Sequence, residues 1–222
     1  MDTQTKPDPR FIAQQLRKPT GDFAKITGEQ MNYFNEFLYD SVIDLMQLKN
    51  NESILEIGFG NGKFFNKLFS KADNLQISGL EYSKEMIEEA NINNQSAISS
   101  GKLNIQFGNC SNMPFPDNSF DKLFCINVIY LWEDPANHLK EIRRVLKPGG
   151  RFYTGIRTKE SMLKIPFTKF GFIIYNENEW KSILQKNDFS FIEAKKIVEP
   201  FIEEEGRSVQ YESICFFAEK RK

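Results

Sequence analysis

The sequence contains only three cysteines and one histidine in 222 residues. Cys110, Cys125 and Cys215 are far apart in the chain and odd in number, so they fit neither a disulfide framework nor the paired spacing of a zinc site. Because a chain without a disulfide framework is typical of a reducing compartment, we expect a cytoplasmic protein without a bound metal.

Long apolar runs and clusters of basic residues are also missing. No apolar run approaches the roughly 18 residues of a membrane-spanning helix, and residues 1–10 lack the apolar centre of a signal peptide. The 29 Lys and Arg residues are scattered and nearly balance the 30 Asp and Glu residues, giving a net charge of −1. This balance disfavours a nucleic-acid partner, which requires a basic face.

Apolar residues, including 21 phenylalanines, make up 40% of the chain, which is enough for one domain with an aromatic-rich core. After residue 50, short apolar runs alternate with segments of helical period, and this alternation predicts βαβ units and a mostly parallel sheet. The strands are expected at 53–59, 75–81, 103–107, 120–128, 151–156, 189–197 and 213–218. The helices are expected at 63–70, 84–93, 136–146 and 177–186.

The region before residue 50 differs from the rest because its pattern is helical throughout. A turn of helix is expected at 11–16, and apolar residues recur with helical spacing over 22–48, where Gly28 is expected to divide the region into two helices. We expect Tyr33 and Phe34 to pack in the core rather than to form a lid. Near the other end, the acidic run 203–205 is expected to be a solvated loop.

Three glycines, Gly58, Gly60 and Gly62, follow the first expected strand. They let the backbone approach a ligand closely, and a helix is expected to begin at Lys63, where free N–H groups favour an anion. About twenty residues later, Glu81 ends the next strand, a position from which a carboxylate can accept hydrogen bonds from ribose hydroxyls. The pattern predicts a ribose-bearing cofactor at the carboxyl edge of the sheet.

The glycine pattern alone leaves several alternatives. A Walker phosphate loop fails, because Phe64 follows Lys63 where Ser or Thr is needed, and Ile57 stands where the first glycine should be. The dinucleotide fingerprint fails at its sixth position, which is Lys63, so NAD is disfavoured. A tight turn without a ligand, with Glu81 as an ordinary surface carboxylate, is the remaining structural interpretation.

Four segments resemble the class I S-adenosylmethionine-dependent methyltransferases, in particular small-molecule methyltransferases of the quinone-biosynthesis type. The segments are ILEIGFGNG at 54–62, ISGLEYS at 77–83, GNCSNMPFPDNSFD at 108–121 and EIRRVLKPGG at 141–150. The resemblance implies a seven-stranded Rossmann-like methyltransferase sheet at 51–222 whose last strand is antiparallel. It also implies that residues 1–50 form a helical N-terminal extension, or lid, over the cofactor side.

The resemblance further implies a site for S-adenosylmethionine. Glu56 and the backbone of 58–62 would hold the methionine part, and Glu81 would take the ribose hydroxyls. Asn127 would lie beside the sulfonium through its backbone carbonyl.

The implied cofactor-binding residues are Glu56, Gly58, Phe59, Gly60, Gly62, Glu81, Tyr82, Ser83, Met86, Asn109, Cys110 and Asn127. Among these, Tyr82 and Met86 would flank the adenine, and Asn109 and Cys110 would meet its edge. Position 109 is often Asp in the family, and Asn brings two donors as well as an acceptor.

No catalytic residue follows from the sequence, because methyl transfer from a sulfonium needs mainly positioning in a dry site. His138 is interpreted as a surface or capping residue, and Cys110 as a small buried residue rather than a nucleophile. Tyr130 and Trp132 either line a substrate mouth or simply pack. The functional hypotheses are a small-molecule methyltransferase, an NAD-linked oxidoreductase, or a non-catalytic cofactor-binding module. The methyl acceptor and the oligomeric state are left open.

Overall fold

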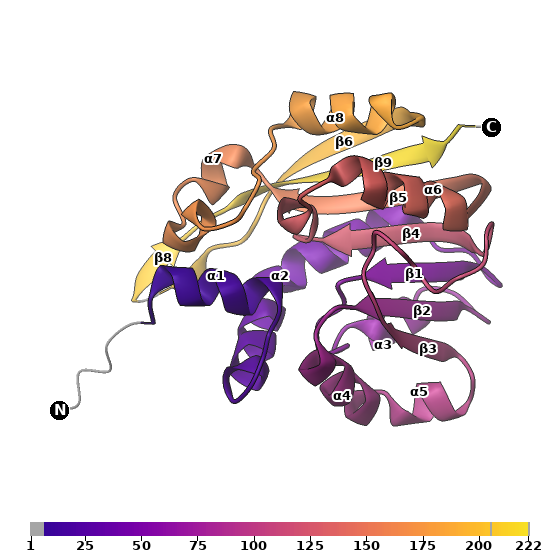
Figure 1. The fold of residues 1–222 in the computed structure, drawn as a ribbon, viewed down its shortest axis with the longest axis horizontal. Helices are drawn as coiled ribbons and strands as arrows, with labels where there is room; N and C mark the ends of the chain where they lie inside the picture. The colour runs from indigo at the N-terminus through magenta and orange to yellow at the C-terminus, as the bar shows by residue number, and fades with distance from the viewer. Residues whose placement is uncertain (1–6, 205, 222) are drawn as a thin grey trace.

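A seven-stranded sheet forms the centre of the protein in this computed structural model, which describes residues 7–204 and 206–221 (Figure 1). The strand order is β3-β2-β1-β4-β5-β9-β6, and β9 is antiparallel to both of its neighbours while the other pairs are parallel. The strands are β1 (Ser53–Ile57), β2 (Gln76–Glu81), β3 (Leu103–Phe107), β4 (Phe120–Ile126), β5 (Leu146–Arg157), β6 (Phe189–Val198) and β9 (Glu212–Lys220). The predicted fold, a mostly parallel sheet with an antiparallel last strand, is confirmed.

Eight α-helices and two short 3-10 helices surround the sheet in the described part of the chain. The α-helices are α1 (Pro9–Arg17), α2 (Phe23–Met46), α3 (Phe65–Phe69), α4 (Lys84–Asn93), α5 (Gln95–Ser99), α6 (Pro135–Val145), α7 (Lys159–Met162) and α8 (Glu177–Lys186). The 3-10 helices are η1 (Ile129–Leu131) and η2 (Pro166–Lys169). None of the described helices is long and apolar enough to cross a membrane.

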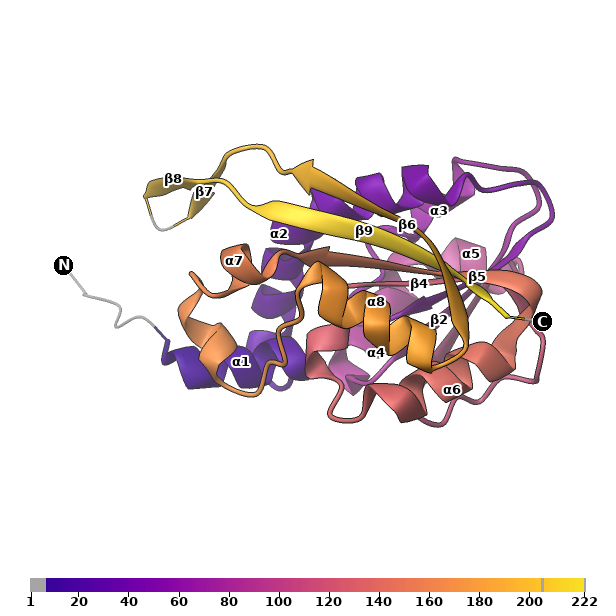
Figure 2. The same ribbon diagram turned by 90° about the horizontal axis from the view of Figure 1, so that it is seen from above.

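Each face of the sheet has its own apolar core. On one face, α6 and α8 cover the sheet with side chains such as Ile142 and Trp180, and on the other face α2 and α3 cover it with side chains such as Val42 and Phe65 (Figure 2). Strand β4 is buried on both sides because Leu123 belongs to the first core and Phe124 to the second. Its almost continuous apolar sequence therefore reflects its central position in the sheet.

Helix α2 is continuous, so the prediction that Gly28 divides this region into two helices is wrong. The reason for the glycine is packing, because a Cβ built at Gly28 would lie 3.2 Å from Sδ of Met86 on α4. Further along α2, Leu38 and Val42 lie against Gly155 of β5, where an added Cβ would meet Val42 Cγ2 at 2.7 Å. The second half of α2 is thus part of the core of the fold.

A small hairpin of β7 (Ile202–Glu204) and β8 (Arg207–Val209) precedes the last strand. Glu203 and Glu204 lie in β7, so the prediction of a solvated loop is wrong for these two residues, and Glu205 lies outside the described residues. The hydroxyl of Tyr211 donates a hydrogen bond to Glu204, which ties the hairpin to the start of the last strand.

Candidate functional site

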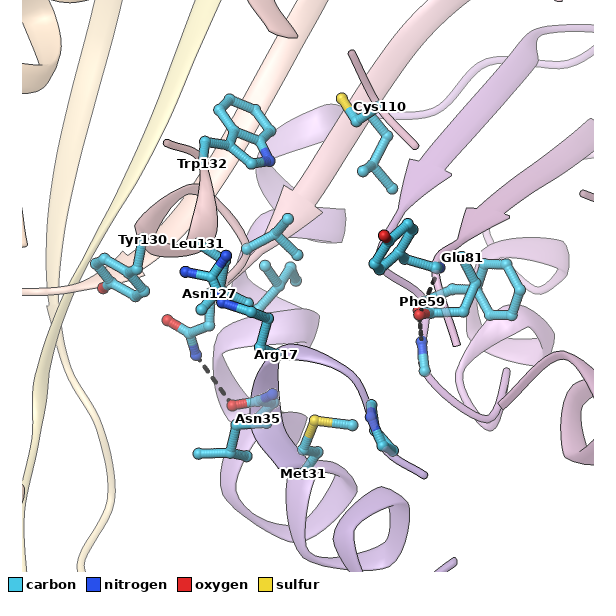
Figure 3. Close-up of a pocket in the computed structure, with 18 of the residues that line it drawn as sticks. Arg17, Met31, Asn35, Phe59, Glu81, Cys110, Asn127, Tyr130, Leu131 and Trp132 are labelled. Atoms are coloured by element: carbon cyan, nitrogen blue, oxygen red, sulfur yellow. Dashed lines mark hydrogen bonds between the residues drawn. The ribbon is translucent and has the colours of Figure 1, made fainter. Parts of the chain in front are cut away.

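The main cavity of the described structure lies at the carboxyl ends of β1, β2, β4 and β5 and has a volume of about 610 Å³. Ligands of open parallel sheets bind in this position because the strand order reverses there. The N-terminal helices close the opposite wall, with Leu16 and Arg17 from α1 and Met31 and Asn35 from α2 (Figure 3). The N-terminal helices and the carboxyl edge of the sheet therefore enclose one cavity.

Most of the predicted cofactor residues line this cavity. They are Glu56, Gly58, Phe59, Gly60, Glu81, Tyr82, Met86, Asn109, Cys110 and Asn127. Gly62 instead lines a smaller hollow behind the loop. Ser83 is fully buried and acts as the N-cap of α4.

The glycine loop enters the cavity with backbone angles that favour glycine. Gly58 and Gly60 have φ values of 72° and 60°, in the left-handed region that other residues rarely adopt. A Cβ at Gly58 would also lie only 2.5 Å from Val128 Cγ2. Gly58 therefore has no room for a side chain, and Gly60 has a backbone conformation that glycine adopts most readily.

Asparagines of α4 hold the loop from behind. Asn93 Nδ2 donates to the carbonyl of Asn61 over 3.0 Å, and Asn94 Nδ2 donates to the carbonyl of Gly62 over 3.1 Å. These bonds take up carbonyl groups on the side of the loop away from the cavity. The sequence analysis missed both residues, since Asn is a common helix-end residue and nothing in the local pattern marks these two.

Glu81 is fixed by three backbone N–H groups. Its Oε1 accepts from Tyr82 and Ser83 over 2.7 and 2.9 Å, and its Oε2 accepts from Gly60 over 3.0 Å (Figure 3). Burial raises the pKa of this carboxyl above its usual range, while the three backbone donors oppose that shift. The carboxylate is thus held rigidly beside the glycine loop, and it retains one lone-pair site, on Oε2, for a further donor.

Glu56 has a different environment, because its described partner is the hydroxyl of Tyr39, which donates to Oε2 over 2.8 Å. Burial raises the pKa of Glu56 to about 8, against the lowering effect of that hydrogen bond. The charge of nearby Glu81 adds to the increase. Two carboxyl groups of different character therefore lie along one wall of the cavity.

At the other end of this wall, Tyr82 is 46% exposed, and its ring stacks on Phe107 with 6.3 Å between ring centroids. Asn109 Oδ1 accepts from both N and Oγ of Ser111 over 3.0 Å, so its oxygen already has two donors. Cys110 is buried, and burial raises the pKa of its thiol, as expected for a packing residue rather than a nucleophile.

Trp132 and Tyr130 are buried, which confirms that they pack, and they also line the cavity, whereas a substrate mouth at these residues stays a prediction. His138 is half-buried, and its ring stacks on Trp132 with 4.8 Å between ring centroids. Its Nδ1 lies 2.7 Å from the carbonyl of Asp134 and must carry the hydrogen, because a carbonyl only accepts. Burial lowers the pKa of this histidine, so the ring is neutral at pH 7.

Apart from Tyr130, the far side of the cavity was not predicted. We call its apolar side chains the apolar recess, which consists of Leu131, Met162, Ile165, Phe167 and Phe172 together with the ring of Tyr130. Behind it, Arg157 forms a buried ion pair with Glu199 at 3.3 Å and donates to the carbonyl of Phe34 over 2.7 Å. Apart from η1, these residues come from segments that lie between 24 positions before and 137 positions after the glycine loop, so no local pattern could group them.

Residues of α2 contribute differently from the prediction. Phe34 is partly buried and lines the cavity, whereas Tyr33 is 55% exposed, so the expectation that Tyr33 packs in the core is wrong. At the next residue, Asn35 Oδ1 accepts a hydrogen bond from Asn127 Nδ2 over 3.0 Å. The N-terminal helix therefore touches the chain directly where β4 ends.

Comparison with known proteins identifies the family that this chain resembles. Residues 55–154 match the model of the methyltransferase domain family. The chain is 37% identical over 100 residues to the O-methyltransferase resE of Aspergillus sclerotiorum, covering 45% of this chain and 38% of that protein. It is 33% identical over 180 residues to the uncharacterized protein MJ1123 of Methanocaldococcus jannaschii, covering 80% of this chain and 77% of that protein.

Among solved structures, the fold is similar to that of a methyltransferase described as putative, from a complex with the Trm112 methyltransferase activator of Haloferax volcanii. The TM-score is 0.77, with 17% identity, over 95% of this chain and 98% of the other. The chain belongs to the class I S-adenosylmethionine-dependent methyltransferases. The match spans well under half the length of the Aspergillus relative.

Proposed function

We propose that the protein transfers a methyl group from S-adenosylmethionine to a small molecule bound in the same cavity. The observation that carries the proposal is Glu81, held by three backbone N–H groups beside the glycine loop at the carboxyl edge of the sheet. Family membership supports it, as do relatives named as methyltransferases of small molecules, such as a 27-O-demethylrifamycin SV methyltransferase.

The lining suits the chemistry of this cofactor. Glu81 accepts one N–H on Oε2 and two on Oε1, which leaves one lone-pair site, on Oε2, for a ribose hydroxyl. Glu56 is the buried carboxyl next to the glycine loop, where it would meet the cationic amino group of the methionine part. The backbone of Gly58 and Gly60 would lie against that same part. A lysine at the sixth position of the fingerprint continues to disfavour NAD.

S-adenosylmethionine supplies a methyl group that is already activated by the sulfonium. This chain therefore has to position the cofactor and the acceptor and to exclude water from them, rather than to generate a nucleophile. Asn127, which follows β4, would mark the point where the cofactor side of the cavity meets the apolar recess. The recess excludes water from the reacting atoms with its aromatic and aliphatic side chains. This division assigns the glycine-loop side to the cofactor and the recess side to the acceptor.

We also propose that residues 1–50 act as a lid on a methyltransferase domain of residues 51–222, with the segment before the second half of α2 as the moving part, because that second half is packed in the core. Three contacts support this role in the described part: Ser83 Oγ donates to the Pro19 carbonyl over 2.6 Å, Arg17 donates to the Gly171 carbonyl over 2.8 Å, and Gly21 N donates to Glu85 over 3.3 Å. The N-terminal segment thus bridges the cofactor side and the recess side. Opening it would give both ligands access.

The experiment is methyl transfer from S-adenosylmethionine labelled with tritium in the methyl group to a small-molecule extract. Label should appear in the low-mass fraction with the wild-type protein and fall strongly with Glu81→Ala. Label in protein or nucleic acid alone would contradict the small-molecule assignment. Cofactor binding without any transfer would favour a non-catalytic binding module.

A further inference from the structure

One arginine at the cavity has a charge that no buried carboxylate neutralises. Arg17, in the last turn of α1, lines the cavity, and its side chain is 37% exposed. Its carboxylate partner in the described structure is Glu133 at 3.4 Å, whose side chain is 86% exposed. An ion pair as exposed as this one is weak, so the guanidinium is available to a better partner.

The guanidinium of Arg17 lies beside the apolar recess. Its Nη2 donates to the carbonyl of Gly171 over 2.8 Å, and Gly171 directly precedes Phe172 of the recess. The same segment is bonded to η1, because the N–H of Ile173 donates to the carbonyl of Tyr130 over 2.8 Å. In Figure 3, Arg17 points away from the glycine-loop side of the cavity and toward Tyr130. A ligand in the recess is therefore within reach of this cation.

Most of the hydrogen-bonding capacity of this guanidinium is unused. Of its five N–H donors, one is directed at the Gly171 carbonyl and one at Glu133 in the described structure. A planar guanidinium can bind a carboxylate through two parallel hydrogen bonds, which give both strength and a defined orientation. Arg17 can therefore bind a carboxylate of a ligand while it keeps its bond to Gly171.

The recess itself suits a flat apolar body. Phe167 and Phe172 lie with their ring centroids 5.6 Å apart, and Tyr130 and Phe172 lie 6.3 Å apart. The hydroxyl of Tyr130 donates to the carbonyl of Arg157 over 2.8 Å and is therefore not offered to a ligand. The apolar recess thus presents ring faces, with one guanidinium at its edge.

Other charged groups near the recess already have partners. Arg157 forms its ion pair with Glu199 at 3.3 Å, and both side chains are buried. Of the carboxylates that line the cavity, Glu204 accepts from the hydroxyl of Tyr211, and Asp134 caps α6. In the described structure, Arg17 is therefore the cation that an anionic ligand of the recess can neutralise.

We propose that the methyl acceptor is a flat apolar acid whose rings lie in the apolar recess and whose carboxylate is bound by the guanidinium of Arg17. This inference rests on the proposed function. The carboxylate of the acceptor takes the place of Glu133 and accepts two parallel N–H bonds. Because Arg17 belongs to the proposed lid, the bound acid also holds the lid against the recess. Arg17 thus determines which acceptors the cavity selects.

Two probes of the same shape that differ in charge test this assignment: 2-naphthoate, which is an anion at pH 7, and 2-naphthamide, which is neutral. Their binding is measured by ligand-observed NMR with the full chain saturated with S-adenosylhomocysteine, which has no sulfonium charge to attract an anion. The wild-type protein should bind 2-naphthoate about 10-fold more tightly, at the low end for a charge-assisted hydrogen bond because Arg17 is partly exposed. Equal affinities, a preference for the amide, or binding of neither probe would overturn the proposal.

Arg17→Gln removes the charge and should bring the two affinities to within about 2-fold, through weaker binding of 2-naphthoate alone. The matched control is Arg10→Gln in the same helix, because Arg10 is exposed and its guanidinium lies over the ring of Phe170, 5.1 Å from the centroid. The preference should persist in this control. Persistence in Arg17→Gln would contradict the role of Arg17. An equal loss of both probes would also contradict it, because Arg17 would then only hold the lid.

Glu133→Gln gives a test in the opposite direction. It removes the carboxylate that competes for Arg17, so 2-naphthoate should bind at least as tightly as to the wild type and up to about 5-fold more tightly. The affinity for 2-naphthamide should not change. Weaker binding of 2-naphthoate to this variant would contradict the proposal.

The proposed function and this inference fail in different ways. A wild-type protein that does not bind S-adenosylhomocysteine, with neither probe added, contradicts the cofactor assignment. A protein that binds it normally but shows no preference for 2-naphthoate contradicts only the assignment of Arg17. Circular dichroism melting of each variant identifies loss of folding, and Glu133→Gln tests the same claim if Arg17→Gln does not fold.

Discussion

Glu81 and Glu56 show at the residue scale how one cavity wall gives two carboxyl groups different properties. Glu81 accepts three backbone N–H bonds, which favour the charged form. Glu56 has a tyrosine hydroxyl as its described partner, and burial raises its pKa to about 8. Each difference leads to a separate measurement.

Glu81→Ala should weaken the binding of S-adenosylhomocysteine about 10- to 150-fold, because a hydrogen bond to a charged group contributes about 1.5–3 kcal/mol. Calorimetric titration measures this loss. Glu88→Ala, which removes an exposed carboxylate of α4, is the control and should bind like the wild type. An unchanged affinity for Glu81→Ala would show that the ribose role belongs to another residue.

The raised pKa of Glu56 predicts a pH dependence of stability. The folded state holds the proton up to about pH 8, whereas a glutamic acid in the unfolded chain loses it near its ordinary pKa of 4.5. This contribution to the free energy of unfolding is therefore complete below pH 4.5 and decreases as the pH rises towards 8, by at most about 1.4 kcal/mol per pH unit.

Urea unfolding of the wild type and of Glu56→Gln at pH 6, 7 and 8 measures this dependence. The wild type should lose stability relative to Glu56→Gln as the pH increases. Parallel profiles would mean that Glu56 is ionised in the folded protein across this range.

At the scale of elements, α2 joins the core to the cavity. The side chains of its second half contact β5 at Gly155. Met31 and Asn35, further towards its N-terminus, line the cavity. The glycine of β5 therefore determines how closely the helix can approach the sheet, and with it the position of the cavity wall.

Gly155→Ala should destabilise the protein by about 1–3 kcal/mol, because the new Cβ would meet Val42 Cγ2 at 2.7 Å. Val42→Ala removes that atom, so the double variant should be less destabilised than the sum of the two single variants. Chemical unfolding of the four proteins gives the coupling energy. Simple additivity would show that the helix does not rest on this glycine.

Local sequence patterns were sufficient to predict most of the helices and strands. The bounds of β3 and α8 agree with the prediction, because their apolar positions and flanking turn residues are strong local signals. Gly28 misled the helix prediction because its role is contact with Met86, a residue 58 positions away. The hairpin at Glu204 was missed because its partner strand, β8 (Arg207–Val209), lies outside the acidic run.

The residues of the site likewise divide into those that a local sequence pattern predicts and those that only the fold brings together. The glycine loop and Glu81 lie in consecutive segments with a known spacing, so the sequence points to them directly. Asn35, Arg157 and Phe172 reach the cavity only through the way α2, β5 and the segment after η2 fold together. Residues of this second kind carry no periodicity or spacing that could be read before the fold is known.

At the scale of the whole molecule, both ends of the chain contribute to one chamber. Leu16 of α1 and Tyr211 before β9 line the same cavity. A ligand that fills the chamber should therefore stabilise the complete fold rather than a single segment, since it binds the folded state alone.

S-adenosylhomocysteine at a concentration 100-fold above its Kd should raise the free energy of unfolding by about 2.7 kcal/mol. For a chain of this size the corresponding increase in Tm is about 5–10 °C. Differential scanning calorimetry measures it, and Glu81→Ala at the same ligand concentration should show a clearly smaller increase. Equal increases for the two proteins would place the ligand elsewhere.

The central claim is that the cavity at the carboxyl edge of the sheet is a site for S-adenosylmethionine, and isothermal titration calorimetry of the full chain tests it most directly. We predict saturable one-to-one binding of S-adenosylmethionine and S-adenosylhomocysteine, and no comparable binding of NAD. The absence of binding of both adenosyl ligands at high micromolar concentration, or a preference for NAD, would contradict the claim.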